Sequence, residues 1–246
     1  YPHVDSIRLP SERGAAYPTG APIVAAHSSS LWVPPQRYNQ SGHAELPGGV
    51  GNATKVDTSP TIQPEPSLIR EARLGYYAAI TWLDQQIGRL LARLEYHQFD
   101  SNTLVVLHGD HGYHLGEHDF WAKVSLLDES SQVPLIISVP GKKPAVCHSL
   151  TELLDLYPTV ASLCGLPKQP RLQGKDISKM LDDPKHTVRT AAFSVAPFRR
   201  GFLLREEDWA YIHYGENGEK GLELYNVKKD PKQYTSLAKD PAYQKI

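Results

Sequence analysis

The distribution of proline constrains the fold of this chain more than any other feature. Ten of the 20 prolines fall before Ser67, none lies between Ser67 and Val133, and ten follow Val133. Because proline disrupts helix interiors and central strands, we expect the first segment to be mostly loop, with one short buried strand at Pro22–Ala26. The longest regular elements should therefore begin at Ser67.

A long helix is predicted from Ser67, which is a suitable N-cap residue. Arg and Gln residues occupy one face of this helix. The other face is an apolar stripe with steps of three and four, formed by Tyr76, Ile80, Leu83, Ile87, Leu90 and Leu94. The stripe predicts a helix that packs against the core.

Two unbroken apolar runs, Thr103–His108 and Val133–Val139, predict central strands, the first of them covered on both faces. A second amphipathic helix is predicted at Glu152–Leu163, stopped by Gly165 and Pro167. The alternation of strands and helices predicts an α/β sheet. Ligands bind beyond the carboxyl ends of the strands in such sheets, so the residues after His108 are the first candidates for a site.

The last quarter of the chain has a different pattern, with short alternating pieces that predict an antiparallel meander. The pieces are Arg189–Ser194, Gly201–Leu204, Trp209–Tyr214 and Leu222–Tyr225, with a turn at Glu216–Gly218. We therefore expect residues 1–183 to form part of an α/β domain and residues 184–246 to form a small antiparallel subdomain.

Composition limits the partners that this chain can have. Among 246 residues, 40% are hydrophobic, which suits a large buried core, and 26 Lys and Arg balance 27 Asp and Glu. This balance gives no reason to expect nucleic acid or an anionic membrane as the main partner. The run Val133–Val139 is far shorter than the roughly 20 residues that span a bilayer. No signal peptide opens the chain, and Tyr1 in place of Met indicates that the N-terminus was trimmed, cleaved or never included.

The cysteines and the glycosylation sequons leave the compartment open. Cys147 and Cys164 lack zinc-ligand spacing and could pair once or not at all. Asn39 and Asn52 each begin a triplet that permits N-glycosylation if the protein is secreted.

The segment directly after the first core strand, residues 109–123, carries the chemistry. Asp110 would supply a hard oxygen ligand to a metal ion, and His111 could ligate the ion or hydrogen-bond an anionic group beside it. Gly109 and Gly112 flank the pair and allow a sharp turn. Lys123 could place a positive charge where a sulfate or phosphate oxygen develops charge.

Nine positions of this segment resemble the second metal-binding segment of the type I sulfatases, in the alkaline phosphatase superfamily. They are Asp110, His111, Gly112, Leu115, Gly116, Glu117, His118, Trp121 and Lys123. Other similar blocks run from about Pro22 to Asp240, including Glu152–Thr159 and Glu223–Asn226. Trp121–Lys123 and the Leu156–Thr159 block resemble the iduronate-2-sulfatase branch most.

This resemblance implies an alkaline phosphatase-like mixed sheet flanked by helices, and hydrolysis of a sulfate ester. In the family, a formylglycine made from cysteine attacks sulfur as its hydrate, and a calcium ion orients the sulfate. By the motif match, Asp110 and His111 would be metal ligands, Lys123 would contact the sulfate as a catalytic residue, and His118 would lie nearby and bind substrate. The expected substrate is a sulfated sugar, with iduronate 2-sulfate of glycosaminoglycans as the candidate.

The sequence departs from the family at the nucleophile. Neither Cys147 nor Cys164 is followed by the family's Pro and Arg, and the only adjacent Asp pair is Asp182–Asp183, in a C-terminal loop. The resemblance therefore implies that the chain is a C-terminal half, and that formylglycine and the first metal half belong to an N-terminal half, the expected partner. Ser28–Ser30 replace the usual Lys-Pro-His, and His27 is the candidate general acid there.

Two further hypotheses stay open. The Asp-His-Gly segment also occurs in phosphodiesterases and phosphonate hydrolases of the superfamily, and the missing nucleophile would suit a non-catalytic binding module. The family implies an exported protein, lysosomal in an animal or periplasmic in a bacterium.

Overall fold

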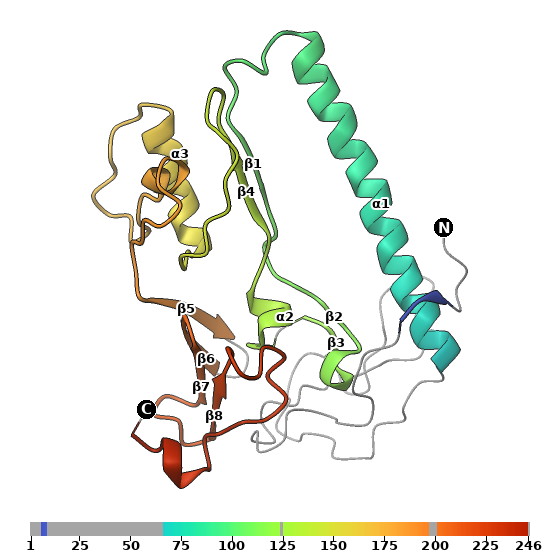
Figure 1. Cartoon of the computed structure of the whole chain (residues 1–246), viewed down its shortest axis with the longest axis vertical. Coiled ribbons are helices and arrows are strands. Elements are labelled where there is room, and N and C mark those ends of the chain that lie inside the picture. Colours follow the sequence, from blue (N-terminus) through green and yellow to red (C-terminus); the bar gives the residue numbers. More distant parts are fainter. Residues whose placement is uncertain (1–5, 9–65, 124, 197–200, 246) are drawn as a thin grey trace.

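The computed structural model describes residues 6–8, 66–123, 125–196 and 201–245 (Figure 1). The predicted long helix is present as α1, Pro66–Tyr96. The prediction that its apolar stripe packs against the core is wrong for the described part of the chain, because Ile80, Leu83 and Leu90 are 49%, 52% and 63% exposed. Near the start of α1, Ile69 is buried, and Arg70 and Arg73 donate to the carbonyls of Ile7 and Leu115.

The two predicted core strands are β1, Val105–His108, and β4, Leu135–Ser138. They pair antiparallel, with Val105 opposite Ser138 and His108 opposite Leu135. The expectation of full cover on both faces is wrong among the described residues, since β1 is half-buried and Ile136 is 59% exposed. The reason is that β1 and β4 form a two-stranded sheet with no further described strand beside them.

Three short elements connect β1 to β4. The strands β2, His114–Leu115, and β3, Trp121–Ala122, pair antiparallel and form a small hairpin, which we call the site hairpin. A 3₁₀ turn at Glu117–Asp119 lies at its tip. The helix α2, Asp128–Ser131, follows. The two acidic residues in its first turn interact favourably with the positive end of the helix dipole.

The second predicted helix is split into a 3₁₀ turn, Leu153–Asp155, and α3, Leu156–Leu163. It ends as predicted, with Gly165 at φ 68°, a left-handed conformation that glycine adopts without strain. The buried Asp155 carboxylate accepts hydrogen bonds from the backbone N–H groups of Glu152 and Lys175. It also pairs with Nη1 and Nη2 of Arg189. This carboxylate fastens α3 to the chain that leads into the C-terminal sheet. A further 3₁₀ turn, Ser178–Leu181, lies on that path.

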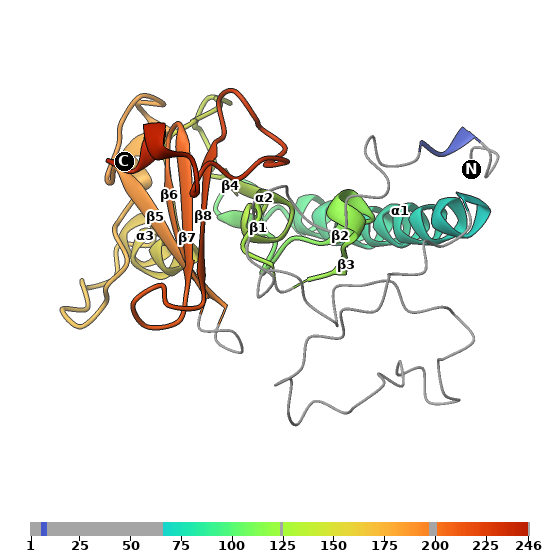
Figure 2. The ribbon, with the colours of Figure 1, turned by 90° about the horizontal axis from the view of Figure 1, so that it is seen from below.

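The predicted C-terminal meander is confirmed as a four-stranded antiparallel sheet in the order β5-β6-β7-β8. Its strands are β5, Ala191–Ala196; β6, Gly201–Glu206; β7, Trp209–Tyr214; and β8, Gly221–Asn226. The predicted turn lies between β7 and β8, where Gly215 and Gly218 have positive φ. A 3₁₀ turn at Pro241–Tyr243 follows, capped by Asp240. Figure 2 shows this sheet and α1 on opposite sides of β1, β4 and α2.

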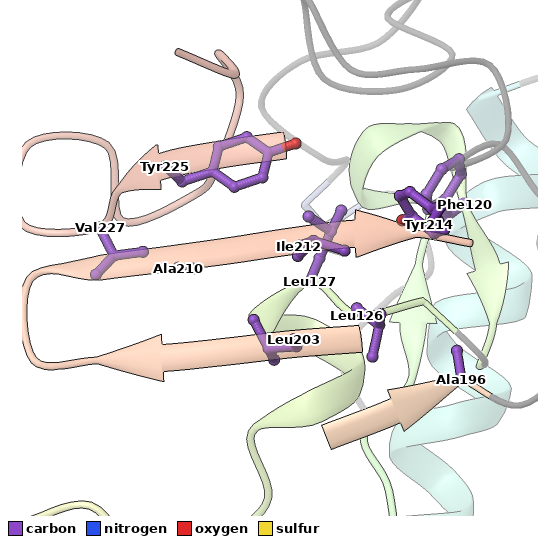
Figure 3. Packing of buried hydrophobic residues seen from close by; sticks show 10 residues of the cluster. All are labelled: Phe120, Leu126, Leu127, Ala196, Leu203, Ala210, Ile212, Tyr214, Tyr225 and Val227. Carbon is purple, nitrogen blue, oxygen red and sulfur yellow. The ribbon is translucent and has the colours of Figure 1, made fainter. Parts of the chain in front are cut away.

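The main apolar core lies between the C-terminal sheet and the segment after the site hairpin (Figure 3). Leu203, Ile212 and Tyr225 come from the sheet, whereas Phe120 and Leu127 come from the hairpin tip and the approach to α2. A domain boundary between residues 183 and 184 stays a prediction, but the parts on either side of it share this core.

Several other expectations concern single residues. Cys147 and Cys164 are both free thiols. In the described part of the chain, no helix combines the length and apolar character needed to cross a bilayer. The predicted strand Pro22–Ala26 and the sequons at Asn39 and Asn52 lie outside the described residues.

Candidate active site

The predicted metal-binding pair follows directly after β1. The backbone N–H of Gly109 donates to the carbonyl of Pro134 at 3.1 Å and so ends the pairing of β1 with the chain before β4. The chain then turns, and the N–H of His111 donates to Oδ1 of Asp110 at 3.1 Å. This bond orients the exposed carboxylate beside the imidazole, with Oδ2 3.6 Å from Nε2 of His111.

Gly112 allows this turn to lie directly on α2. Its N–H donates to the carbonyl of Ser130 at 2.8 Å. A Cβ at this position would lie 2.0 Å from the carbonyl oxygen of Glu129, a distance that no side chain could tolerate. Glycine is therefore required by the close approach of α2, in addition to the turn that the sequence predicted.

The site hairpin returns the chain to the same place. With His114 opposite Ala122, and Leu115 opposite Trp121, the residue after β3 lies near the residues before β2. Nζ of Lys123 is consequently 2.8 Å from Nε2 of His111, although 12 positions separate them in the sequence. The structure thus brings together three of the predicted site residues: Asp110, His111 and Lys123.

Hydrogen bonds assign the roles of the two His111 nitrogens. Nδ1 lies 2.8 Å from the carbonyl oxygen of Gly112, which can only accept, so Nδ1 carries the proton. Nε2 then presents a lone pair, which accepts from the ammonium of Lys123. His111 in this way holds the lysine head beside the carboxylate of Asp110.

The residues fit a calcium site in part. The Asp110 carboxylate is 84% exposed and offers the hard oxygen that Ca²⁺ prefers. His111 could turn Nε2 to an ion only by giving up its contact with Lys123. Calcium takes about six to eight oxygen ligands, and no group of three His, Cys, Asp or Glu residues suited to a metal occurs in the described ranges. The described residues would supply at most one side of such a site, and the assignment of Asp110 and His111 as ligands stays a prediction.

His118 lies elsewhere. Its side chain is 1% exposed, and its ring contacts His114, Phe120 and Tyr234. None of these contacts reaches the Asp110, His111 and Lys123 group, so they lend no support to substrate binding by His118, which stays a prediction. His27, the candidate general acid, lies outside the described residues.

Sequence reasoning missed the residues that hold the site hairpin in place. Oε2 of Glu117 accepts the N–H of Leu115 at 2.6 Å, and Arg73 of α1 reaches both the carbonyl of Leu115 at 3.2 Å and Oε1 of Glu117 at 3.4 Å. A basic residue on the apolar face of a helix is the signal that could have identified Arg73. This side chain ties the start of α1 to the site.

A second missed residue, His114, belongs to β2 of the site hairpin. It is fully buried, and its Nε2 lies 2.6 Å from Oγ of Ser125. Burial lowers its pKa from 6.5 to about 4, an effect that the nearby Glu129 carboxylate offsets only in part. His114 is therefore neutral at physiological pH.

A groove of about 1490 Å³ opens beside the site. Asp110, His111 and Lys123 line one part of it, and the chain after β4, including Lys142 and Lys143, lines another. Its volume exceeds the roughly 300–1,000 Å³ of ordinary small-ligand pockets.

The comparison with known families decides the assignment. Residues 25–166 match the family described as Sulfatase, and residues 116–246 match the family described as N-sulphoglucosamine sulphohydrolase, C-terminal. The chain belongs to the sulfatase family. The first match contains the whole segment from Asp110 to Lys123, and the second contains the C-terminal sheet.

Two curated relatives illustrate the similarity. Choline-sulfatase of Rhizobium meliloti (strain 1021) is 31% identical over 181 residues, which cover 70% of this sulfatase chain and 34% of the relative. Iduronate 2-sulfatase of Homo sapiens is 35% identical over 128 residues, covering 42% of this chain and 23% of the relative. The resemblance to iduronate 2-sulfatase is thus confirmed for part of the chain, which spans about a third or less of these relatives.

Solved structures give the same fold. A 2-O GAG sulfatase is 30% identical with a TM-score of 0.67, covering 74% of this chain and 42% of that one. A structure in complex with D-glucosamine-2-N,6-O-disulfate is 26% identical with a TM-score of 0.64, covering 74% and 40%. The phosphonate monoester hydrolase of Silicibacter pomeroyi is 26% identical with a TM-score of 0.66, covering 77% and 41%. The predicted alkaline phosphatase-like α/β class is therefore confirmed.

Proposed function

We propose that this chain is the part of a sulfatase that binds the sulfate group of a sulfated sugar during hydrolysis of the ester. The observation that carries the proposal is the contact between Lys123 and His111, beside the exposed carboxylate of Asp110. A cation and a cation-binding carboxylate, side by side at the mouth of a large groove, suit an anionic substrate. Membership of the sulfatase family makes sulfate the expected anion.

Each residue has a distinct task in this proposal. Lys123 donates from its ammonium to a sulfate oxygen and stabilises the negative charge that grows there as the ester bond breaks. His111 accepts from the same ammonium through Nε2 and so limits the positions that Nζ can take. Asp110 would hold calcium through its exposed carboxylate, and calcium when bound would supply positive charge to the sulfate oxygens.

The nucleophile is proposed to come from outside this chain. Formylglycine would be supplied by an N-terminal half of the same protein, since neither Cys147 nor Cys164 has the family's flanking Pro and Arg. The exposed stripe of α1, and the β1 and β4 pair, which no other described strand covers, offer that partner a large apolar surface. Similarity to a 2-O GAG sulfatase and to iduronate 2-sulfatase favours iduronate 2-sulfate of glycosaminoglycans as the substrate. We also propose that the protein is exported, to the lysosome of an animal or to the periplasm of a bacterium.

The test is sulfate release from an iduronate 2-sulfate disaccharide, by the chain joined to its N-terminal half. Lys123→Ala should lower kcat/KM by about 10²- to 10³-fold, the usual cost of removing one donor to a developing oxyanion. Lys228→Ala is the matched control, because Lys228 pairs on the surface with Asp208 in the C-terminal subdomain. An unchanged rate with Lys123→Ala would show that the assigned role of Lys123 is wrong.

Similarity to a phosphonate monoester hydrolase supports a second candidate, phosphonate or phosphate ester hydrolysis at the same site. The two reactions separate when one preparation is given sulfate, phosphate and phosphonate monoesters of the same alcohol. A higher kcat/KM for sulfate supports the main proposal, and a strong preference for a phosphorus ester supports the second. A protein that binds calcium or a sulfated sugar without turnover of any ester would instead be the non-catalytic module.

A further inference from the structure

The short helix α2 contacts two segments of the chain that meet at the candidate site. The first arm carries Asp110 and His111 after β1, and the second arm runs from the hairpin tip through β3 to Lys123. On the first arm, the N–H of Gly112 donates to the carbonyl of Ser130, immediately after Asp110 and His111. On the second arm, His118 precedes Lys123 by five positions, and its Nε2 lies 3.8 Å from Oε2 of Glu129. Glu129 and Ser130, which are adjacent in α2, therefore contact the segment of the predicted metal-binding pair and the segment of the lysine.

The position of His118 is fixed from several sides. It has φ 56° and ψ 21°, a left-handed conformation that few residues other than glycine adopt. Its ring lies 5.0 Å from that of Tyr234, which belongs to the segment after β8, and 6.3 Å from those of His114 and Phe120. A non-glycine residue persists in such a backbone conformation only where its surroundings determine it.

Charge also favours the contact with Glu129. Burial raises the pKa of the Glu129 carboxyl, but the interaction with His118, together with the backbone N–H of Glu129 and the nearby His114, brings the pKa below its usual range. Nζ of Lys232 lies 4.0 Å from the other oxygen of Glu129. His118 and Lys232 therefore contact this carboxylate from two sides, one at each oxygen.

We propose that His118 is a positioning residue, which through Glu129 of α2 holds Lys123 at the distance from His111 that sulfate binding requires. The proposal rests on the proposed function for the role of Lys123, and it replaces direct binding of substrate by His118. Since the imidazole is 1% exposed, it acts on the substrate indirectly: its contact with Glu129 holds the hairpin tip, from which β3 leads to Lys123. Loss of the pair with Glu129 would let the β3 arm shift relative to the arm of His111.

The first test measures the geometry of the site without any turnover. In the 246-residue chain labelled with ¹⁵N-histidine, the Nε2 resonance of His111 reports its contact with Lys123. Two variants disturb the pair of His118 and Glu129. Glu129→Gln removes the charge of the carboxylate at nearly constant volume, and His118→Asn removes the imidazole but keeps a residue that tolerates the left-handed backbone. We expect both variants to move the resonance toward its position in Lys123→Ala.

The second test is a double-mutant cycle with the intact enzyme on the iduronate 2-sulfate disaccharide. His118→Asn and Glu129→Gln should each lower kcat by about tenfold to a hundredfold, with a change in KM of less than about twofold. In the Lys123→Ala background the same substitutions should cost less than about twofold, because the group that they position is gone. Asp208→Asn, which breaks an exposed ion pair with Lys228, is the control for charge removal.

Two results would overturn the proposal: an unmoved His111 resonance in both variants, or losses in kcat that are as large with Lys123→Ala as without it. If the unaltered enzyme releases no sulfate, the proposed function fails, and the resonance alone then decides whether His118 positions Lys123. A folded His118→Asn whose KM rises while kcat is retained would indicate direct substrate binding.

Discussion

The buried His114 makes the stability of this protein depend on pH in a predictable direction. Its pKa is about 4 in the folded chain and 6.5 when exposed, so between these values the unfolded chain binds a proton that the folded chain does not. Stability therefore rises with pH across this window and is lost as the pH falls from about 6.5 to about 4. Below pH 4 both states are protonated and the loss is complete.

The size of the effect follows from the two pKa values. A shift of one unit corresponds to about 1.4 kcal/mol, so the loss between pH 7.5 and pH 5 amounts to about 2 kcal/mol. The side chain is fully buried, so solvent screens this effect little. A loss of that size is a large part of the roughly 5–15 kcal/mol by which domains are stable.

Urea unfolding at several pH values measures this loss, with His114→Gln as the comparison. Glutamine does not titrate, and its amide can still reach Oγ of Ser125, the partner of Nε2 in the native chain. The difference in unfolding free energy between the two proteins should change by about 2 kcal/mol from pH 7.5 to pH 5. Glu223, which is not among the groups that shift the pKa of His114, titrates in both proteins and cancels in the difference. A difference that stays constant over this range would refute the reasoning.

Three other substitutions test the architecture around the site. Asp155→Ala leaves the buried Arg189 with Glu152 as its remaining carboxylate partner and should lower the free energy of unfolding by about 3 kcal/mol in a urea titration. Gly112→Ala forces α2 away from the turn and should cost about 1–3 kcal/mol by the same assay, and it should also weaken the Lys123 contact seen in the ¹⁵N spectrum. Asp110→Asn should lower calcium affinity at least about tenfold by calorimetry in the intact protein, because an amide oxygen lacks the charge of a carboxylate.

Local sequence pattern was sufficient for the elements and for the group of site residues. The period of Tyr76 to Leu94 predicted α1, and the Asp110 to Lys123 motif predicted the cluster that the hairpin brings together. The exposure of Ile80 and Ile136 was not predictable, because a pattern indicates which face is apolar and does not reveal whether another segment covers it. The burial of His118 was not predictable for the same reason.

Contacts between distant positions were the other part that the sequence did not reveal. Arg73 reaches Leu115 across 42 positions, and Gln233 accepts the N–H of Asp128 across 105 positions. No short motif records such pairs, since in each of them one partner is a backbone group, which any residue type would supply. These contacts decide how the site hairpin and α2 are held.

Because of the shared core, the structure of the site depends on the last quarter of the chain. Leu126 and Leu127, which lead into α2, are buried against Leu203, Ile212 and Tyr225 of the C-terminal sheet. A premature stop codon or a proteolytic cut near residue 190 would spare every residue of the motif from Asp110 to Lys123. It would nevertheless leave these leucines in water and remove the support of α2, so a truncated protein with an intact motif should be inactive and prone to aggregation.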